Sequence, residues 1–259
     1  MENENRKILI TGASSGLGRE LAHQFAQKGN VELILVARRK EALEKVAKKC
    51  ETFDNVKTRV FSVDIGSQDQ VEQLLSNITD IDILVNGAGY GIMKDFSEFC
   101  DAEVVNMFDT NVIGTIQLTT EIAKRMRERK SGTIVTIASI AGKIATPKSS
   151  VYSATKFALI GYFNALRLEL KKDNVHVMTV NPGFGGQKFI EGSIKKVQRL
   201  RQLIDREGSK ALIEVDGGVQ AETAPRLVEA GVDILVSGSY VFKAADPKAT
   251  IHSLKQLHR

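Results

Sequence analysis

The sequence predicts an α/β fold in which helices cover both faces of a doubly wound parallel sheet. Short runs rich in Val, Ile and Leu alternate along the chain with amphipathic helical stretches. Such alternation favours parallel strands joined by right-handed helical crossovers. A glycine-rich turn follows the first apolar run, and polar residues follow several later runs. We therefore expect a ligand site at the carboxyl edge of the sheet.

The expected strands are the β-rich apolar runs at 7–11, 31–37, 56–64, 81–86, 133–138, 175–181, 212–215 and 234–237. The clearest helical stretches between them are 41–50, 71–78, 102–130 and 151–172. The run at 175–181 reads as a buried parallel strand that ends in the turn Asn181-Pro182-Gly183. The pattern of the chain changes after this turn, so the strand divides the sequence into two parts.

Composition narrows the class of protein. A chain of 259 residues with 42% hydrophobic and 26% charged residues can bury a sizeable core, and we expect one domain. The net charge is +5, but Lys and Arg alternate with Glu and Asp, which indicates a solvated surface and no nucleic-acid partner. The polar amino terminus lacks the apolar core of a signal peptide, and we expect no membrane association. Cys50 and Cys100 lie far apart, in no metal-ligand spacing, and fit a reducing cytoplasm.

The first crossover opens with the sequence TGASSGLG, residues 11–18. Glycines at these places let the backbone turn tightly and approach a pyrophosphate, and the following helix offers its free N–H groups to the anion. A simple glycine-rich turn is the alternative for a lone motif. The position after a strand and before a helix favours nucleotide binding. The residues concerned are Gly12, Ser14, Ser15, Gly16 and Gly18.

Arginines follow the second strand, where an NAD site usually carries an acidic residue that holds the ribose hydroxyls. A guanidinium there suits a 2′-phosphate, because its planar donors pair two phosphate oxygens at once. Arg38 therefore favours NADP(H) as the cofactor. Two solvated arginines at a helix start are the alternative, which applies more to Arg39. Asp64 and Asn86 close the third and fourth strands at the same edge.

Tyr152 and Lys156 are four residues apart at the start of a helix, which places them on one face. A phenol titrates near 10, and a neighbouring ammonium favours the phenolate and lowers that pKa. Tyr152 can then exchange a proton with a substrate oxygen. Asn111 within a helical stretch and Ser139 after the fifth strand are further candidates. Taken singly, each has a purely structural explanation.

Together these residues resemble the short-chain dehydrogenase/reductase family over residues 7–183. The resemblance rests on TGASSGLG, the NGAG turn at 86–89, Asn111, Ser139 in SIAG, and YSATK at 152–156, in the order and spacing of the family. It implies a Rossmann-like sheet and hydride transfer between a nicotinamide and a carbonyl or alcohol. It also implies association of subunits through the two longest helices.

Residue by residue, the resemblance implies that Tyr152 is the acid/base and that Lys156 holds the nicotinamide ribose. It implies that Ser139 bonds the substrate oxygen and that Asn111 anchors a water-linked proton path. The implied cofactor site comprises Gly12, Ser14, Ser15, Gly16, Gly18, Arg38, Asp64, Asn86, Tyr152, Lys156, Pro182 and Gly183. Gly87 departs from the family, which usually has a second asparagine there, and we expect a looser strand-to-strand hydrogen bond.

The tail of the chain is similar to a different family. NPGFGGQKF, IEVDGGV and AGVDILVSGSYVF are similar to the last three βα units of ribulose-phosphate 3-epimerase, a TIM barrel. The resemblance implies an acid/base carboxylate at Asp216 and phosphate-binding loops. The loop residues are Gly185, Gly186, Gly217, Gly218, Gly238 and Ser239. The metal ligands of the epimerase come from earlier barrel strands and are missing here, so we expect neither a metal site nor epimerase activity.

The sequence leaves open how residues 184–259 pack and whether the chain is catalytic. We expect residues 184–259 to extend the sheet of residues 1–183, with 213–218 as its seventh strand and 194–207 as the crossover helix. The alternative is a separate half-barrel lobe, which would leave strand edges unpaired. The hybrid chain then has three candidate functions: an NADP(H)-dependent oxidoreductase, a scaffold that binds NADP(H) or phosphate without catalysis, and, least favoured, a sugar-phosphate enzyme similar to the epimerase. The second reading is motivated by the missing substrate-covering helices.

Overall fold

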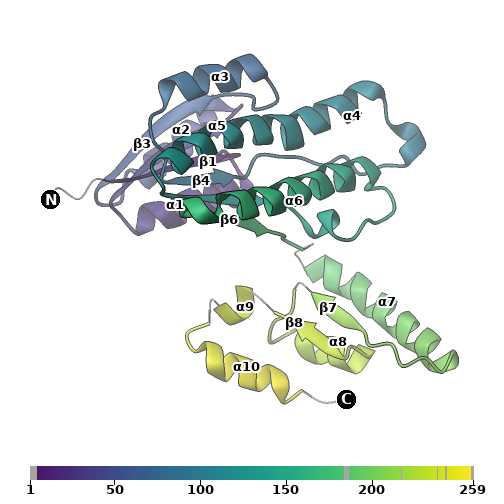
Figure 1. Ribbon diagram of the computed structural model, residues 1–259. Helices are drawn as coiled ribbons and strands as arrows, with labels where there is room; N and C mark the ends of the chain where they lie inside the picture. Colours follow the sequence, from purple (N-terminus) through teal and green to yellow (C-terminus); the bar gives the residue numbers. More distant parts are fainter. Residues whose placement is uncertain (1–4, 184–186, 217, 238, 243, 258–259) are drawn as a thin grey trace. The chain divides into compact units, whose positions relative to one another are not determined.

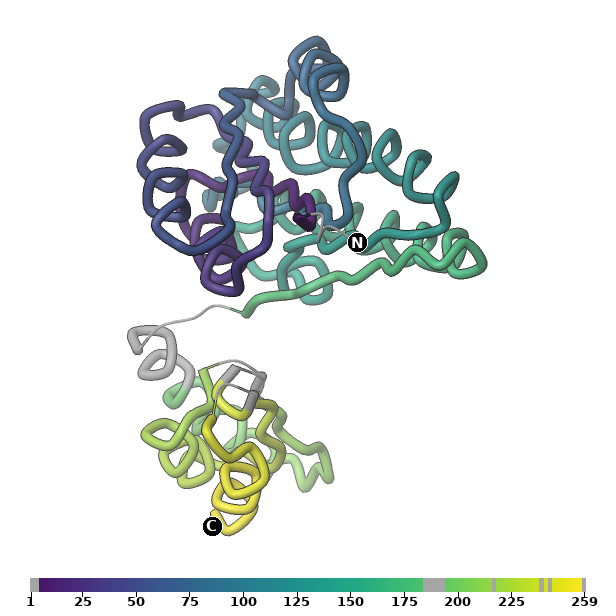
Figure 2. Tube along the Cα trace, turned by 90° about the vertical axis from the view of Figure 1, so that its left-hand side faces the viewer, coloured from purple at the N-terminus to yellow at the C-terminus, as the bar shows by residue number. Residues whose placement is uncertain are grey.

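The computed structural model describes residues 5–183, 187–216, 218–237, 239–242 and 244–257. The chain divides into two compact units, Met1–Asn181 and Pro182–Arg259. The colour gradient of Figures 1 and 2 follows the chain through both units.

The first unit is built on a six-stranded sheet with the order β3-β2-β1-β4-β5-β6, in which every pairing is parallel. The order reverses between β1 and β4, and such a switch point leaves a crevice at the carboxyl ends of the strands. The doubly wound sheet predicted from the sequence is confirmed. The strands are β1 (Arg6–Thr11), β2 (Val31–Ala37), β3 (Val56–Ser62), β4 (Ile83–Asn86), β5 (Gly132–Ile137) and β6 (Val175–Val180).

Helices cover both faces of this sheet (Figure 1). Ile8 and Ile10 pack with α1 and α2 on one face, whereas Leu9 packs with α3, α5 and α6 on the other. Successive side chains of a strand point to opposite faces, and burial of each stabilises the fold by about 1.5–3 kcal/mol. The helices are α1 (Gly16–Gln27), α2 (Lys40–Cys50), α3 (Gln68–Asn77), α4 (Asp101–Phe108), α5 (Gly114–Glu128) and α6 (Ser150–Leu170).

Four shorter helical segments complete the first unit. Three are 3₁₀ turns, η1 (Phe96–Glu98), η3 (Ile140–Gly142) and η4 (Lys171–Asp173). The fourth, η2 (Asp109–Ile113), is a π-helical turn between α4 and α5. The single helix predicted at 102–130 is therefore interrupted. Within the described parts of the chain, no helix combines the length and apolar character that a membrane crossing needs.

The second unit contains α7 (Gln187–Arg206), β7 (Glu214–Asp216), α8 (Ala224–Ala230), β8 (Ile234–Val236), α9 (Ser239–Phe242) and α10 (Pro247–Lys255). Among the described residues β7 pairs with β8 in a separate parallel sheet, and the six-stranded sheet ends at β6. The sequence led us to expect 213–218 as the seventh strand of the six-stranded sheet, whereas in the structure β7 pairs with β8. Val215 and Leu235 instead pack in a core that the unit builds with its own helices, around Val197 and Leu227.

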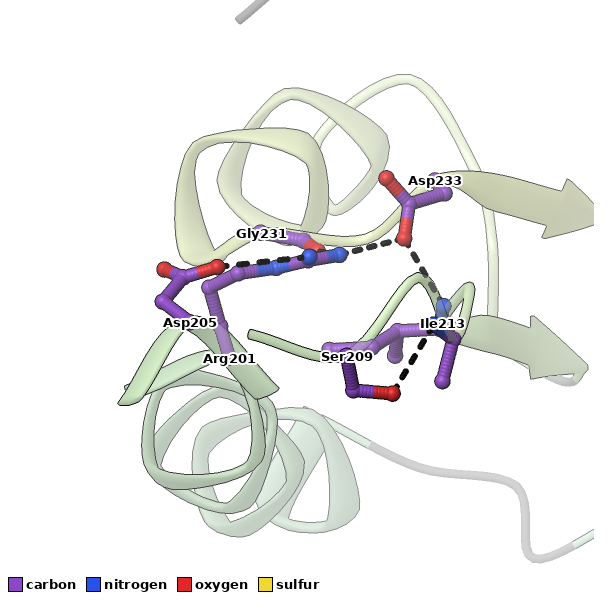
Figure 3. A network of polar contacts seen from close by, with 7 residues as sticks. Arg201, Asp205, Ser209, Ile213, Gly231 and Asp233 are labelled. Carbon is purple, nitrogen blue, oxygen red and sulfur yellow. Dashed lines mark hydrogen bonds and ion pairs between the residues drawn. The ribbon is translucent and has the colours of Figure 1, made fainter. Parts of the chain in front are cut away.

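An arginine connects α7 to the turn between α8 and β8 in the second unit (Figure 3). Arg201 of α7 donates to the carbonyl oxygen of Gly231 from Nε at 3.2 Å and from Nη2 at 2.9 Å, and it pairs with the carboxylate of Asp233. Asp233 in turn accepts from the backbone N–H of Ile213 at 2.8 Å. Because charge-assisted bonds are stronger than neutral ones, this network fixes α7 against the turn between α8 and β8.

Candidate active site

The turns after β1 and β4 lie against each other at the switch point of the sheet. The hydroxyl of Thr11 accepts from the N–H groups of Gly87 and Ala88, both at 3.1 Å. Gly12 has φ +71°, and a Cβ there would lie 2.6 Å from the carbonyl oxygen of Gly87. A side chain at residue 12 would therefore push the two turns apart, which explains the first glycine of the motif.

Gly87 also fits this close approach. A Cβ at Gly87 would lie 2.7 Å from the carbonyl oxygen of Thr11, so the asparagine usual in the family would need the backbone to shift. The expectation that Gly87 loosens a strand-to-strand hydrogen bond stays a prediction. The hydroxyl of Thr11 makes the connection, and the glycine lets the two backbones meet.

The amino terminus of α1 offers an anion site. Ser15 is its N-cap residue and makes no side-chain cap, and the first turn carries no acidic residue. Ser15 and Gly16 are exposed, and a Cβ at Gly16 would have nothing within 4 Å. Gly18 allows α1 to close on the turn, because a Cβ there would lie 2.5 Å from the oxygen of Gly12. Open N–H groups at a helix start suit the pyrophosphate of a dinucleotide.

Both arginines after β2 reach this edge of the sheet. Arg39 Nη2 donates to Ser14 Oγ at 3.2 Å, within the glycine-rich turn. Arg38 Nη1 lies 3.9 Å from Asp64 Oδ2, with the Arg38 side chain 66% exposed. An exposed pair at this distance contributes only about 0–1 kcal/mol, so it leaves Arg38 available to a phosphate. Arg39, for which the sequence also allows a solvated position, is the N-cap residue of α2, and its side chain contacts the glycine-rich turn.

The two polar residues after β3 and β4 differ in exposure. Asp64 accepts from the N–H of Gly66 at 2.9 Å, and its carboxylate is partly exposed. Asn86 is 3% exposed, and its Nδ2 donates to Thr119 Oγ1 at 2.9 Å and Thr136 Oγ1 at 3.2 Å. The Asn86 side chain thus joins α5 to β5 within the core. A nucleotide contact at this position would come from the backbone of the turn.

Asn111 lies in the π-helical turn η2 and is completely buried. Its Oδ1 accepts from the N–H of Tyr90 at 2.9 Å, and its Nδ2 donates to the carbonyl of Tyr90 at 2.8 Å and to Thr155 Oγ1 at 3.1 Å. Such π-helical turns within α-helices are frequent at functional sites. The side chain connects the loop after β4 to α6, the helix that carries Tyr152 and Lys156.

Three of the predicted catalytic residues lie beside the carboxyl end of β5: Ser139, Tyr152 and Lys156. Lys156 is 4% exposed, and its Nζ donates to the carbonyl of Ile137 at 3.3 Å. The same Nζ lies 5.6 Å from the centroid of the Tyr152 ring, so the predicted shared face is observed. Burial lowers the pKa of Lys156 to about 8. Ser139 is 8% exposed, and its Oγ accepts from the N–H of Ala141 at 3.1 Å.

The remaining predicted site residues belong to the second unit. Pro182 and Gly183 follow β6 and are grouped with that unit. The expected loop residues Gly185, Gly186, Gly217 and Gly238 lie outside the described residues. Gly218 has φ +69° and its carbonyl accepts from Thr223 Oγ1 at 2.6 Å, while Ser239 begins α9 and Asp216 ends β7. The phosphate site expected in these loops stays a prediction.

Known proteins match the two parts of the chain separately. The model of the short chain dehydrogenase family matches residues 6–193, and that of the Ribulose-phosphate 3 epimerase family matches residues 146–242. The two matches overlap over residues 146–193, a range that contains α6, η4, β6 and the start of α7. The boundary between the two units, after Asn181, lies within this overlap.

Among relatives, an NADP-dependent 3-hydroxy acid dehydrogenase of Schizosaccharomyces pombe is 34% identical over 191 residues, 72% of this chain and 74% of that protein. A dehydrogenase/reductase SDR family protein 7-like of Anopheles gambiae is 38% identical over 186 residues, 68% of this chain, but the match spans only 58% of that protein. A solved short-chain dehydrogenase from Sphingobium yanoikuyae in complex with NADPH has a TM-score of 0.66 and 30% identity, over 70% of this chain and 72% of that chain.

The match to the short chain dehydrogenase family covers residues 6–193, more than half of the chain, and the parallel six-stranded sheet agrees with it. The chain therefore belongs to the short chain dehydrogenase family, and it is joined at its carboxyl end to a segment that matches the Ribulose-phosphate 3 epimerase family.

Proposed function

We propose that the protein is an NADP(H)-dependent oxidoreductase that transfers a hydride between the nicotinamide and a small carbonyl or alcohol substrate. One observation carries the proposal. Tyr152 lies one helical turn from Lys156, whose buried ammonium is 5.6 Å from its ring, at the sheet edge that also holds the glycine-rich turn. An acid/base group beside a nucleotide site is what hydride transfer to a carbonyl requires.

The chain offers a group for each part of the nucleotide. The N–H groups at the start of α1 suit the pyrophosphate, and the guanidinium groups of Arg38 and Arg39 suit a 2′-phosphate. We assign the carboxylate of Asp64 to the adenosine and the ammonium of Lys156 to the nicotinamide ribose. The nicotinamide supplies or accepts the hydride when it is bound.

The protein groups move and hold the proton. In the direction of reduction, the hydroxyl of Tyr152 gives its proton to the substrate oxygen, and in oxidation the phenolate takes it back. Ser139 Oγ holds the same oxygen, and the charge of Lys156 stabilises the phenolate. Both N–H donors of the Asn111 carboxamide are already used by Tyr90 and Thr155. We therefore assign its part in a water-linked proton path to its backbone carbonyl.

The choice of NADP(H) rests on the two arginines and on the relatives. The Schizosaccharomyces pombe protein is named NADP-dependent, and the Sphingobium yanoikuyae enzyme was solved with NADPH. A structural neighbour that is 25% identical is an NAD⁺-bound xylitol dehydrogenase, so the fold alone does not decide between NAD(H) and NADP(H). Titration with NADPH and NADH, followed by the fluorescence of the reduced nucleotide because the chain has no tryptophan, tests the choice. We expect tighter binding of NADPH, and equal, negligible affinity for both nucleotides would contradict the proposal.

A second candidate is a folded scaffold that binds NADP(H) or phosphate without catalysis. It is favoured by the end of the six-stranded sheet at β6, after which the chain enters the second unit. Chemistry at the nicotinamide needs an oriented ring and a pocket poor in water. A survey of carbonyl substrates by NADPH absorbance separates the two candidates. Turnover of any substrate excludes the scaffold, and tight binding without turnover supports it.

We also propose a cytoplasmic location and a homo-oligomer. Cys50 is buried and Cys100 exposed, and both are free thiols, which suits a reducing compartment. Apolar side chains are exposed on α4 and α6, including Val105 and Phe157. Two copies that pack these helices together would cover them. Sedimentation of the full chain tests this association, and a monomer at all concentrations would contradict it.

A further inference from the structure

The ring of Tyr152 lies against a glycine in the loop after β4. A Cβ built on Gly91 would lie 2.8 Å from Cδ2 of Tyr152, 3.0 Å from Cγ and 3.1 Å from Cε2. Side chains in close-packed proteins do not approach this closely, so the ring occupies the space that a side chain at residue 91 would need. The NGAG turn ends at Gly89, so the motif itself gives no reason for a glycine at 91.

The loop that carries Gly91 is held on both sides. On one side, Asn111 binds both the N–H and the carbonyl of Tyr90. On the other, the N–H of Lys94 donates to the carbonyl of Lys148 at 3.0 Å, and the Lys94 ammonium pairs with Glu103 at 2.5 Å. With the backbone anchored at both ends, a side chain at residue 91 displaces the ring of Tyr152 more readily than it displaces the loop.

We propose that Gly91 is a positioning residue, whose bare backbone sets the orientation of the Tyr152 phenol. This inference rests on the proposed role of Tyr152 as the acid/base. Proton transfer needs the phenol oxygen within hydrogen-bond reach of the substrate oxygen. A displacement of about 1 Å can cost about 100-fold in rate. A methyl group at residue 91 is therefore enough to impair catalysis through its effect on the Tyr152 ring.

The test compares Gly91→Ala with Gly161→Ala. Gly161 lies on α6, the helix of Tyr152, and a Cβ there would have nothing within 4 Å. Gly91 lacks a positive φ, so alanine can adopt its backbone conformation. We expect Gly91→Ala to lower kcat by about 10- to 100-fold while the Kd for NADPH stays that of the wild type. Gly161→Ala keeps the wild-type kcat. A wild-type kcat in Gly91→Ala would overturn the inference.

A spectroscopic measurement tests the positioning role of Gly91 independently of the proposed oxidoreductase activity. In protein labelled with fluorotyrosine, the ¹⁹F resonance of Tyr152 is identified by its loss in Tyr152→Phe. We expect this resonance to move in Gly91→Ala and to stay in place in Gly161→Ala, even if the wild type turns over no substrate. An unmoved resonance in Gly91→Ala would overturn the positioning role, whereas absent turnover in the wild type would count only against the oxidoreductase.

A double variant covers the case in which Gly91→Ala does not fold. If the new methyl meets the ring, Gly91→Ala/Tyr152→Ala folds as well as Tyr152→Ala alone, because the two changes are coupled. A double variant that also fails to fold, beside a folded Tyr152→Ala, would show that the methyl meets something else and would overturn the inference.

Discussion

The carboxamide of Asn111 pairs with both backbone polar groups of Tyr90. Its Oδ1 accepts from the Tyr90 N–H at 2.9 Å, and its Nδ2 donates to the Tyr90 carbonyl at 2.8 Å. A carboxamide offers an N–H donor and a carbonyl acceptor, as a peptide group does. Beyond the end of β4, Asn111 therefore binds the backbone of Tyr90 in the way that a neighbouring strand would. It joins the π-helical turn η2 to the loop that runs past Tyr152.

Replacement of Asn111 should therefore weaken the fold as well as the site. In Asn111→Leu the N–H and carbonyl of Tyr90 lose their partners, and we expect the free energy of unfolding to fall by about 1–3 kcal/mol. Urea denaturation followed by circular dichroism measures this loss. The matched control is Asn164→Leu, which changes an exposed asparagine on α6. Equal stability of the two variants would contradict the structural role of Asn111.

If the glycine-rich turn binds NADPH as proposed, Arg39 should contribute to the binding, because its Nη2 lies 3.2 Å from Ser14 Oγ in that turn. We expect Arg39→Ala to weaken NADPH binding by about 1.5–3 kcal/mol, the worth of hydrogen bonds to a charged group, and to leave NADH binding unchanged. Isothermal titration with both nucleotides measures the difference. Lys45→Ala removes an exposed charge from the same helix and serves as the control. A parallel loss of affinity for both nucleotides would argue against a 2′-phosphate contact.

The buried ammonium of Lys156 should make stability depend on pH. Burial lowers its pKa from 10.5 to about 8 in the folded protein. Between these values the unfolded chain keeps a proton that the folded protein has released, so the free energy of unfolding should rise with pH across this window. Lys156→Met should lack this rise. Denaturant titrations of the nucleotide-free proteins at several pH values test it, and parallel curves for the two proteins would contradict the buried ammonium.

In the second unit, Arg201→Met should loosen the turn between α8 and β8. The change leaves the carbonyl of Gly231 and the carboxylate of Asp233 without the guanidinium that binds them. We expect faster amide hydrogen exchange at Ile213 and along β8, since the lost hydrogen bonds involve a charged group and each contributes about 1.5–3 kcal/mol. Arg199→Met replaces an exposed arginine of α7 and is the control. Exchange that is unchanged in Arg201→Met would show that the apolar core alone holds the unit.

The strands and the turns at their ends could be predicted because their signals are local. Apolar runs, the glycine motif and the spacing of Tyr152 and Lys156 each lie within one or two elements, and the structure contains them within a few residues of the predicted bounds. The interrupted helix at Asn111 was not predicted, because the apolar pattern continues through η2. The hydrogen bonds that Asn111 makes to Tyr90 and Thr155 join residues far apart in the sequence.

The partner of β7 could not be predicted for a different reason. A short apolar strand suits a seventh position in the first sheet as well as a pair with β8, and only the surrounding core decides between them. The direction of the Asn86 side chain and the contact of Gly91 with Tyr152 also depend on which elements meet. Such contacts leave no periodic signal in a single sequence.

The central claim is that Tyr152 exchanges a proton with a substrate at a bound nicotinamide. Its most direct test is NADPH oxidation over a panel of small carbonyl compounds, by the wild type and by Tyr152→Phe. We predict turnover of at least one compound by the wild type, and in Tyr152→Phe a kcat lowered by about 10²- to 10⁴-fold, with NADPH binding unchanged. Wild-type turnover in Tyr152→Phe, or no turnover of any compound by the wild type, would contradict it.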